Sequence, residues 1–298
     1  MTMSPNKKSL FVTGGSGFLG RRFLELMDRS VFEKVVCLRH STPVADLPGI
    51  TFVEGDLEDS ESYRAHIEEG MTIVHLAGLT GKGSKADHFK FNFEATQALL
   101  RAAADQAACE FLFVSSVAVA FEDRSGYHYA EAKEVAEQAV LTSSIPSLIV
   151  RPTMIFGPDA PVLQGLAKLA SAPIVPVFGG GENQCQPVFV DDLAKWLEFA
   201  IHGMVFDDST HTIGGSTKLT MKELLVELRQ RSNKGTGGLV RFPLRSTRFM
   251  LRVAEPLLLS LLPLTAGQLA SFANDSISSP LPESFGGNLL TTPLSEMF

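Results

Sequence analysis

The sequence predicts an α/β fold, a doubly wound parallel sheet with a smaller, mostly helical C-terminal substrate domain. Two observations support it. Short apolar runs alternate with helical stretches through the first half of the chain, and strands separated by helices pair in parallel. The first of these runs also leads into a glycine-rich turn and then into residues at helical spacing.

The stretch from Leu10 to Gly20 is typical of a strand, a tight turn and a helix. In such a turn Gly14 permits the bend and Gly17 lets the backbone approach a pyrophosphate. Gly20 lets the helix lie close to the strand, and the first helical N–H groups face the anion. Glycines of this kind also serve packing alone. Because the flanking strand and helix are both present, we interpret the turn as a Rossmann dinucleotide site. Its predicted members also include Phe18 and Leu19.

The second apolar run bears on the choice of cofactor. In a site for NAD, an acidic residue about 20 positions after the glycines holds the ribose hydroxyls. This sequence has Arg39, which stands 19 residues after Gly20. A guanidinium there suits a 2′-phosphate. We therefore expect NADP, with NAD as the alternative; a solvent-facing arginine at a strand end is the other interpretation of Arg39.

The third and fourth runs end in small or polar residues at the expected carboxyl edge of the sheet, where ligands bind in doubly wound folds. Asp56 follows the third run and is expected to accept from an adenine amino group. Its alternative role is the N-cap of a helix that starts near Asp59. His75 lies inside the fourth run with no second metal ligand nearby, so we interpret it as a core histidine and expect no metal.

Tyr129 and Lys133 are four residues apart in a helical stretch and therefore share a helix face. A phenol titrates near 10 in water, too high for a general base at neutral pH. An ammonium group beside it, together with the positive nicotinamide ring, favours the phenolate. This spacing alone is also common in surface pairs. The glycine turn and a fifth strand that ends in Ser115 and Ser116 favour a catalytic pair.

These motifs together resemble the extended or atypical branch of the short-chain dehydrogenase/reductase superfamily. The resemblance covers most of the chain. The motifs that carry it are Thr13-Gly14-x-x-Gly17-x-x-Gly20, Gly55-Asp56-Leu57, His75-Leu76-Ala77, Asn92 with Thr96, Ser115-Ser116, Tyr129-x-x-x-Lys133, Arg151-Pro152-x-x-x-x-Gly157-Pro158 and Val190-Asp191-Asp192-Leu193.

The resemblance implies a role for each matched residue. Tyr129 would be the catalytic acid/base, Lys133 would hold the cofactor ribose as well as the tyrosine, and Ser116 would hydrogen-bond the substrate oxygen. The remaining residues implied at the cofactor site are Asp56 and Leu57 at the adenine, Leu76, Ala77 and Gly78 at the ribose and pyrophosphate, Asn92 behind the site, Ser115, and Pro152, Thr153 and Ile155 at the nicotinamide.

Members of this family return to the first sheet late in the chain, so the domains are expected to be discontinuous. Residues 1–156 and 184–214 would form the NAD(P)-binding Rossmann domain. Residues 157–183 and 215–298 would form the substrate-binding domain.

The C-terminal half contains two further predicted helices, at about Leu193–Ile201 and at Leu219–Arg231, the second with Thr220 as its N-cap. The apolar segment Phe249–Leu264 is too short and interrupted to span a bilayer. We interpret it as a lid or substrate-domain helix, with contact to a membrane surface as the alternative. The tail after Ser276 has weak periodicity and is expected to be loosely held.

Departures from the family pattern bear on the substrate. Gln184, Cys185 and Gln186 stand where nucleotide-sugar enzymes commonly carry a diphosphate-binding arginine. Only 12 residues separate Ser116 from Tyr129, fewer than in sugar epimerases. We expect an oxidoreductase that transfers hydride between NADP(H) and a carbonyl/alcohol of a small, fairly apolar molecule. A nucleotide-sugar epimerase/dehydratase and a non-catalytic dinucleotide-binding assembly or sensor protein are the alternatives.

Composition and the N-terminal sequence bear on the partners and the cellular compartment of the protein. A net charge of −7 argues against a nucleic-acid-binding surface. The three cysteines are far apart and are expected to be buried thiols in a reducing compartment. The N-terminus leaves no room for a signal peptide before the glycine turn, which favours a cytoplasmic protein.

We expect a small-molecule substrate, no nucleic-acid or membrane partner, and a symmetric homodimer. The dimer would form through helices Asp87–Ala108 and Tyr129–Thr142. The alanines expected to allow close helix approach are Ala102, Ala103, Ala136 and Ala139.

Overall fold

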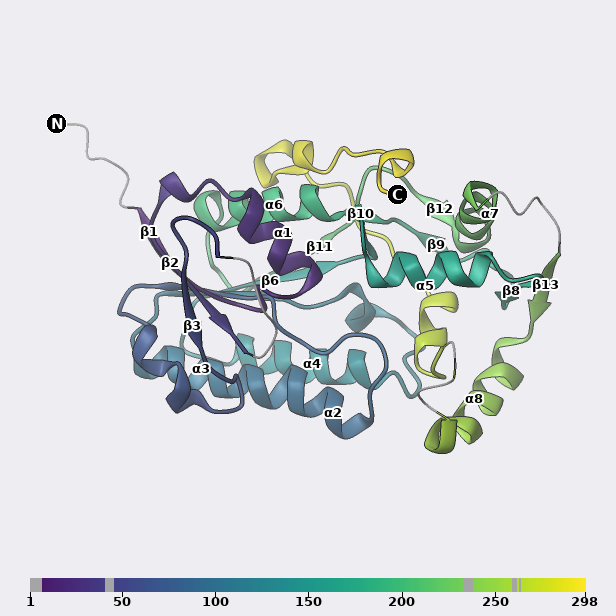
Figure 1. The fold of residues 1–298 in the computed structure, drawn as a ribbon, viewed down its shortest axis with the longest axis horizontal. Helices are drawn as coiled ribbons and strands as arrows, with labels where there is room; N and C mark the ends of the chain where they lie inside the picture. Colours follow the sequence, from purple (N-terminus) through teal and green to yellow (C-terminus); the bar gives the residue numbers. More distant parts are fainter. Residues whose placement is uncertain (1–6, 41–45, 233–237, 259–261, 263) are drawn as a thin grey trace.

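The computed structural model describes residues 7–40, 46–232, 238–258, 262 and 264–298. Its centre is a seven-stranded parallel sheet in the order β11-β6-β5-β4-β1-β2-β3 (Figure 1). The strands are β1 (Lys8–Thr13), β2 (Phe32–Arg39), β3 (Thr51–Glu54), β4 (Thr72–His75), β5 (Glu110–Val114), β6 (Ser147–Pro152) and β11 (Ser209–Ile213). The predicted doubly wound sheet is confirmed. The strand order reverses between β1 and β4, and this switch point is where such sheets bind ligands.

Helices cover both faces of the sheet (Figure 1). On one side lie α1 (Phe18–Leu26) and α6 (Val190–Gly203); on the other lie α2 (Lys85–Phe89), a π-helical turn (Lys90–Glu94), α3 (Ala95–Asp105) and α4 (His128–Leu141). Side chains alternate along a strand. Leu10 and Val12 of β1 therefore belong to the core under α1 and α6, while Phe11 belongs to the core under α3 and α4.

A smaller lobe surrounds a third apolar core. It combines three helices with short strand pairs. Its elements are α5 (Pro161–Ala170), α7 (Met221–Arg231), α8 (Leu244–Leu258), and the pairs β7 (Ile155–Phe156) with β10 (Val188–Phe189), β9 (Gln184–Cys185) with β12 (Leu219–Thr220), and β8 (Val175–Phe178) with β13 (Leu239–Phe242). The predicted cap of α7 is confirmed, because Thr220 accepts from the Glu223 backbone and the Glu223 carboxylate accepts from Thr220.

The C-terminal tail packs along α6, and the expectation of a loosely held tail is wrong (Figure 1). The Trp196 indole donates to the Phe285 carbonyl at 2.9 Å. The Asp192 carboxylate accepts from both the backbone and the hydroxyl of Thr292, at 2.8 Å each. The tail is built of short 3₁₀ turns after prolines, which carry no helical or strand periodicity.

Three local expectations also fail. Cys109 is exposed, in the loop just before the amino end of β5, whereas Cys37 and Cys185 are buried as predicted. The segment from near Asp59 forms 3₁₀ turns at Ser60–Ser62 and Arg64–His66 rather than an α-helix.

The alanines Ala102, Ala103 and Ala136 are buried in the core against the sheet, so they do not form an outer face for close helix approach.

Across the described ranges, no helix has the length and apolar character needed to cross a bilayer. In the apolar run near α8, Leu259–Leu261 lie outside the described residues.

Candidate functional site

The glycine turn between β1 and α1 is shaped by close packing at two positions and is open at a third. Gly14 has a φ of +78°, and a Cβ there would lie 2.5 Å from the Ala77 nitrogen. At Gly20 a Cβ would lie 2.1 Å from the Gly14 carbonyl oxygen. At Gly17 the Gly14 oxygen, at 3.2 Å, is the nearest contact, and α1 begins there without a side-chain cap. The outer side of Gly17 and the first N–H groups of α1 can therefore take an anion.

Gly15 is a glycine that the sequence reasoning missed. A Cβ at Gly15 would lie 2.5 Å from the Cys37 sulfur and 2.8 Å from a Leu24 methyl carbon. Two adjacent glycines in a sequence indicate that another part of the chain packs closely against the backbone. That Cys37 on β2 is the residue packed there can be seen only in the fold.

The end of β4 meets the helix that carries Asn92. A Cβ at Gly78 would lie 2.6 Å from Asn92 Oδ1 and 3.3 Å from Lys133 Nζ. Asn92 Nδ2 donates to the carbonyls of Leu79 and His88, at 3.0 Å each, but its buried Oδ1 has no hydrogen-bond partner. The buried hydroxyl of Ser115 also has none. Buried polar atoms are normally paired, so these two fit a ligand that brings hydroxyl or amide groups, as a nicotinamide dinucleotide does.

Lys133, on α4, has an ammonium group that is shielded from solvent and held by its contacts. Its side chain is buried, its Nζ donates to the Val114 carbonyl at 2.9 Å and lies 4.5 Å from the centre of the Phe113 ring. Burial lowers the pKa of Lys133 to about 8, while the nearby Glu137 carboxylate acts in the opposite direction. Glu137 in turn accepts two hydrogen bonds from Arg151, at 2.8 and 2.5 Å.

Tyr129 lies one turn before Lys133, in the first turn of α4. Its phenol lies near Ser116, whose hydroxyl accepts from the Ala118 backbone at 3.2 Å. Burial raises the pKa of Tyr129 above its ordinary value; Tyr127 adds to this, and the nearby Ser116 hydroxyl opposes it. The structure therefore brings Ser116 and Tyr129 together, with Lys133 on the same helix, and keeps the phenol protonated in the ligand-free protein.

His88 is a second residue that the sequence reasoning missed. It is 4% exposed, its ring centre lies 6.0 Å from that of Tyr129 in an edge-on arrangement, and its Nδ1 has no hydrogen-bond partner. Burial lowers the pKa of His88. It lines a small cavity of about 30 Å³ together with Tyr127. The other lining residues are Gly81, Gly83, Gly126, His128, Glu255, Thr265 and Gly267.

The predicted adenine side lies at the ends of β2 and β3. Arg39 is already paired there, with its Nε 2.7 Å from Glu54 and its NH1 3.6 Å from Asp46. The Asp56 carboxylate accepts from the Glu58 backbone at 3.0 Å. Leu57 packs against the core under α3 and α4.

The predicted nicotinamide side follows β6. Pro152 is buried at the end of that strand, and Ile155 is half-buried in β7. Thr153 donates its hydroxyl to the Gln186 carbonyl at 2.5 Å. The Gln186 side chain is used as well, because its amide donates to the Gly215 carbonyl at 2.6 Å and accepts from the Ser278 backbone at 2.8 Å. Gln186 therefore joins structural segments and does not face a ligand.

His75 is the core histidine that the sequence predicts. It is fully buried, with Nδ1 2.6 Å from the Thr13 hydroxyl and Nε2 2.9 Å from the Thr96 hydroxyl. Burial lowers the pKa of His75 to about 3, with a smaller contribution from Lys133. Within the described ranges, no group of three or more His, Cys, Asp or Glu side chains could hold a metal ion.

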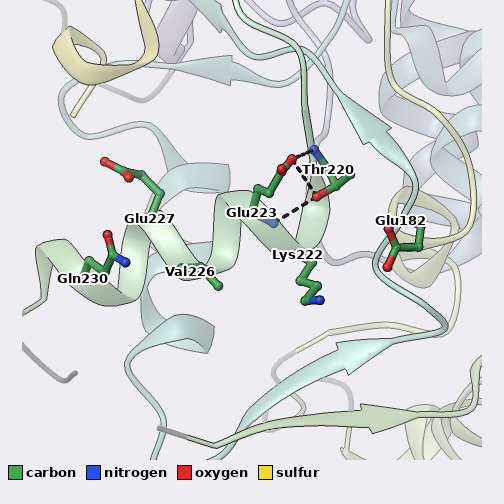
Figure 2. Close-up of a pocket in the computed structure, with 7 residues that line it drawn as sticks. All are labelled: Glu182, Thr220, Lys222, Glu223, Val226, Glu227 and Gln230. Carbon is green, nitrogen blue, oxygen red and sulfur yellow. Dashed lines mark hydrogen bonds between the residues drawn. The ribbon is translucent and has the colours of Figure 1, made fainter. Parts of the chain in front are cut away.

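A separate hollow of about 380 Å³ lies beside α7 (Figure 2). Its lining residues are Glu182, Thr220, Lys222, Glu223, Val226, Glu227 and Gln230. Three of these are glutamates, and Figure 2 shows the Glu223 carboxylate turned back onto Thr220. The excess of carboxylates opposes an anionic ligand such as a dinucleotide.

Comparisons with known proteins agree with this geometry. The model of the NAD dependent epimerase/dehydratase family matches residues 10–212. dTDP-glucose 4,6-dehydratase from Streptomyces niveus is 27% identical over 263 residues, 76% of this chain and 78% of that protein. Ceramide reductase from Caulobacter vibrioides is 30% identical over 193 residues, 63% of this chain and 59% of that protein.

Solved structures show the same fold. The gox2253 structure aligns with a TM-score of 0.71 and 21% identity, covering 92% of this chain and 90% of that one. A dTDP-glucose 4,6-dehydratase from Streptomyces venezuelae with NAD bound aligns with a TM-score of 0.66 and 22% identity, covering 78% and 84%. The chain belongs to the NAD dependent epimerase/dehydratase family of NAD-dependent enzymes, within the extended short-chain dehydrogenases/reductases.

Proposed function

We propose that this enzyme transfers hydride between NADP(H) and a carbonyl/alcohol of a small, fairly apolar molecule. The observation that carries the proposal is the contact between Ser116 and Tyr129 beside the buried ammonium of Lys133. Ser116 follows the carboxyl end of β5, and Tyr129 and Lys133 lie on α4.

The residues that would hold the dinucleotide are those around the glycine turn and the end of β4. Gly17 and the start of α1 offer N–H groups to the pyrophosphate, while Asn92, Ser115 and Lys133 offer polar groups to the ribose and nicotinamide. The bound cofactor supplies the hydride donor or acceptor. In reduction, Tyr129 gives its proton to the carbonyl oxygen and Ser116 donates a hydrogen bond to that oxygen. In oxidation the phenolate takes the proton, and the Lys133 ammonium stabilises it.

Two observations support an apolar substrate over a nucleotide sugar. The Gln186 side chain makes structural hydrogen bonds, so it is not offered to a diphosphate. Aromatic rings, those of Tyr127 and His88, flank Tyr129. The similarity to a ceramide reductase points in the same direction.

The second candidate is a nucleotide-sugar epimerase/dehydratase. The observation that favours it is the similarity to dTDP-glucose 4,6-dehydratase, which extends over more of the chain than the similarity to the reductase. A non-catalytic dinucleotide-binding protein is the third, and it predicts cofactor binding without turnover.

The deciding experiment is a thermal-shift screen of carbonyl compounds and sugar nucleotides, each with NADP or NAD. Hits are then assayed for dinucleotide oxidation or reduction in the wild type and in Tyr129→Phe. We expect stabilisation and turnover with apolar ketones or alcohols. Stabilisation by nucleoside diphosphates with sugar conversion would establish the second candidate, and cofactor binding without any turnover the third.

We also propose a symmetric homodimer built on the outer faces of α3 and α4, in a reducing cytoplasm. The large apolar side chains Phe91 and Leu141 are each 40% exposed on this helical layer. The free thiols Cys37, Cys109 and Cys185 support the reducing compartment.

A further inference from the structure

Helix α8 presents an apolar stripe to solvent. Phe249, Met250 and Val253 are 69%, 69% and 63% exposed. Phe249 and Val253 are four residues apart and Met250 is adjacent, so the three side chains share one helix face. Large apolar side chains gathered on one exposed face mark a docking surface.

The stripe is flanked by positive charge. Arg245 is exposed on the same helix, and Arg241 is exposed on β13 just before it. From Leu239 to Leu258 the chain has four arginines and one glutamate, Glu255. Since the whole protein has a net charge of −7, this concentration of arginine is local.

The opposite face of α8 is fixed to the body of the protein. Arg248 pairs with Asp123 at 2.6 Å, Arg252 donates to the Ser125 hydroxyl at 2.7 Å, and Leu251 packs on the core of the small lobe. These contacts leave Phe249 on the outer face. Figure 1 shows α8 at the edge of the molecule, below β8 and β13, where an extended surface can reach it.

We propose that the exposed face of α8 docks on an anionic lipid bilayer, with the helix lying in the plane of the interface. A basic amphipathic helix with Phe, Met and Val on one face has the chemistry of such a contact: the apolar side chains enter the acyl boundary and the arginines meet phosphate groups. A symmetric contact with a second copy is less favourable, because it would bring Arg241 and Arg245 of the two copies into one interface. The proposal favours the alternative interpretation of the apolar segment that includes Phe249, contact with a membrane surface, over the preferred one of a lid or substrate-domain helix. It does not depend on the catalytic proposal.

The test is co-flotation of the purified protein with vesicles of phosphatidylcholine, with and without 30% phosphatidylglycerol. We expect binding that needs the anionic lipid and weakens with salt. The triple variant Phe249→Ser, Met250→Ser, Val253→Ser should lower binding at least ~10-fold, since each apolar side chain contributes up to about 1.5–3 kcal/mol when buried. Arg245→Gln should lower it roughly fivefold, from about 1 kcal/mol per arginine.

The matched control is Val205→Ser with Ile174→Ser, which removes exposed apolar side chains elsewhere, at 75% and 56% exposure. This control should bind vesicles as the wild type does, and thermal melting should show that all variants are folded. Absence of wild-type binding, or equal binding by the folded triple variant, would overturn the proposal. Concentration-dependent self-association that the triple variant abolishes, without vesicle binding, would instead identify a second copy as the occupant.

Discussion

Arg39 and Glu54 face each other at the ends of the neighbouring strands β2 and β3, with Nε and Oε1 2.7 Å apart. Both side chains reach solvent, at 30% and 68% exposure, and an exposed ion pair of this kind contributes little stability. A 2′-phosphate can therefore replace the Glu54 carboxylate at small cost. We therefore expect the cofactor preference to depend on the charge of Glu54 as well as on that of Arg39.

The first prediction concerns this preference. NADP(H) should bind more tightly than NAD(H), Arg39→Asp should reverse the order by about ten- to a hundredfold, and Glu54→Gln should strengthen NADP binding further. Calorimetric titration with both dinucleotides measures the three cases. Glu68→Gln, which removes another exposed pairing partner, that of Lys34, should change neither affinity. Equal affinities in the unmutated protein would refute the assignment of Arg39.

The second prediction separates proton transfer from binding. Tyr129→Phe should lower kcat by at least ~10²-fold and leave the dinucleotide Kd unchanged, because the phenol oxygen is needed only for the proton. Tyr127→Phe is the control, since its ring lies 5.8 Å from that of Tyr129. Full turnover by Tyr129→Phe on an identified substrate would show that the proton comes from another group.

The third prediction follows from the buried ammonium. The pKa of Lys133 falls from an ordinary value of 10.5 to about 8 on folding. Between these values the unfolded chain holds more protons than the folded one, so Lys133 makes the free energy of unfolding rise with pH from 8 to 10.5. The slope should be up to about 1.4 kcal/mol per pH unit steeper in the wild type than in Lys133→Met. Urea unfolding at pH 8, 9 and 10 measures it; parallel curves would contradict the lowered pKa. The same variant should lose dinucleotide affinity.

The fourth prediction concerns acid. The pKa of His75 falls from 6.5 to about 3 in the folded protein. In this range His75 is protonated in the unfolded chain but stays neutral in the folded protein. The free energy of unfolding therefore falls as pH drops from 6.5 towards 3. His75→Gln should show a shallower loss over this window, by up to about 1.4 kcal/mol per unit. An unchanged slope would mean that other groups dominate acid unfolding; His66→Gln, at a histidine outside the core, is the control.

The fifth prediction concerns assembly. If Leu141 and Phe91 lie in a dimer interface, Leu141→Arg with Phe91→Arg should yield a folded monomer at micromolar concentration. Light scattering distinguishes the two states. Leu26→Arg, at a similarly exposed leucine on α1, should leave the dimer intact. A monomeric wild type would rule the dimer out.

The sequence predicts what depends on local pattern. Gly14 and Gly20 follow from the turn that a strand and helix require, and His75 follows from the apolar run around it. The partners of Arg39 do not follow, because the pairing with Glu54 depends on the register between β2 and β3. The inward orientation of Ala136 does not follow from the sequence either. A helix that is buried on one face and forms a dimer with the other can have small residues on both faces, so an alanine does not show which face it is on.

His88 and the tail show the same limit. A histidine one turn before Asn92 carries no signal in its neighbours, and its contact with Tyr129 forms only when α2 and α4 pack together. The bond between Asp192 and Thr292 joins residues that are 100 positions apart. No periodicity within the tail reports on a partner at that distance.

The return of the tail to α6 has a consequence for synthesis. During synthesis, the Trp196 indole and the Asp192 carboxylate are made before their hydrogen-bond partners, Phe285 and Thr292, which lie 89 and 100 residues further along the chain. At about 5–20 residues per second, the ribosome takes roughly 5–20 s to supply them. During that interval the nascent sheet can assemble while the outer side of α6 is still uncovered, so this helix is the part of the young protein that a chaperone would need to shield.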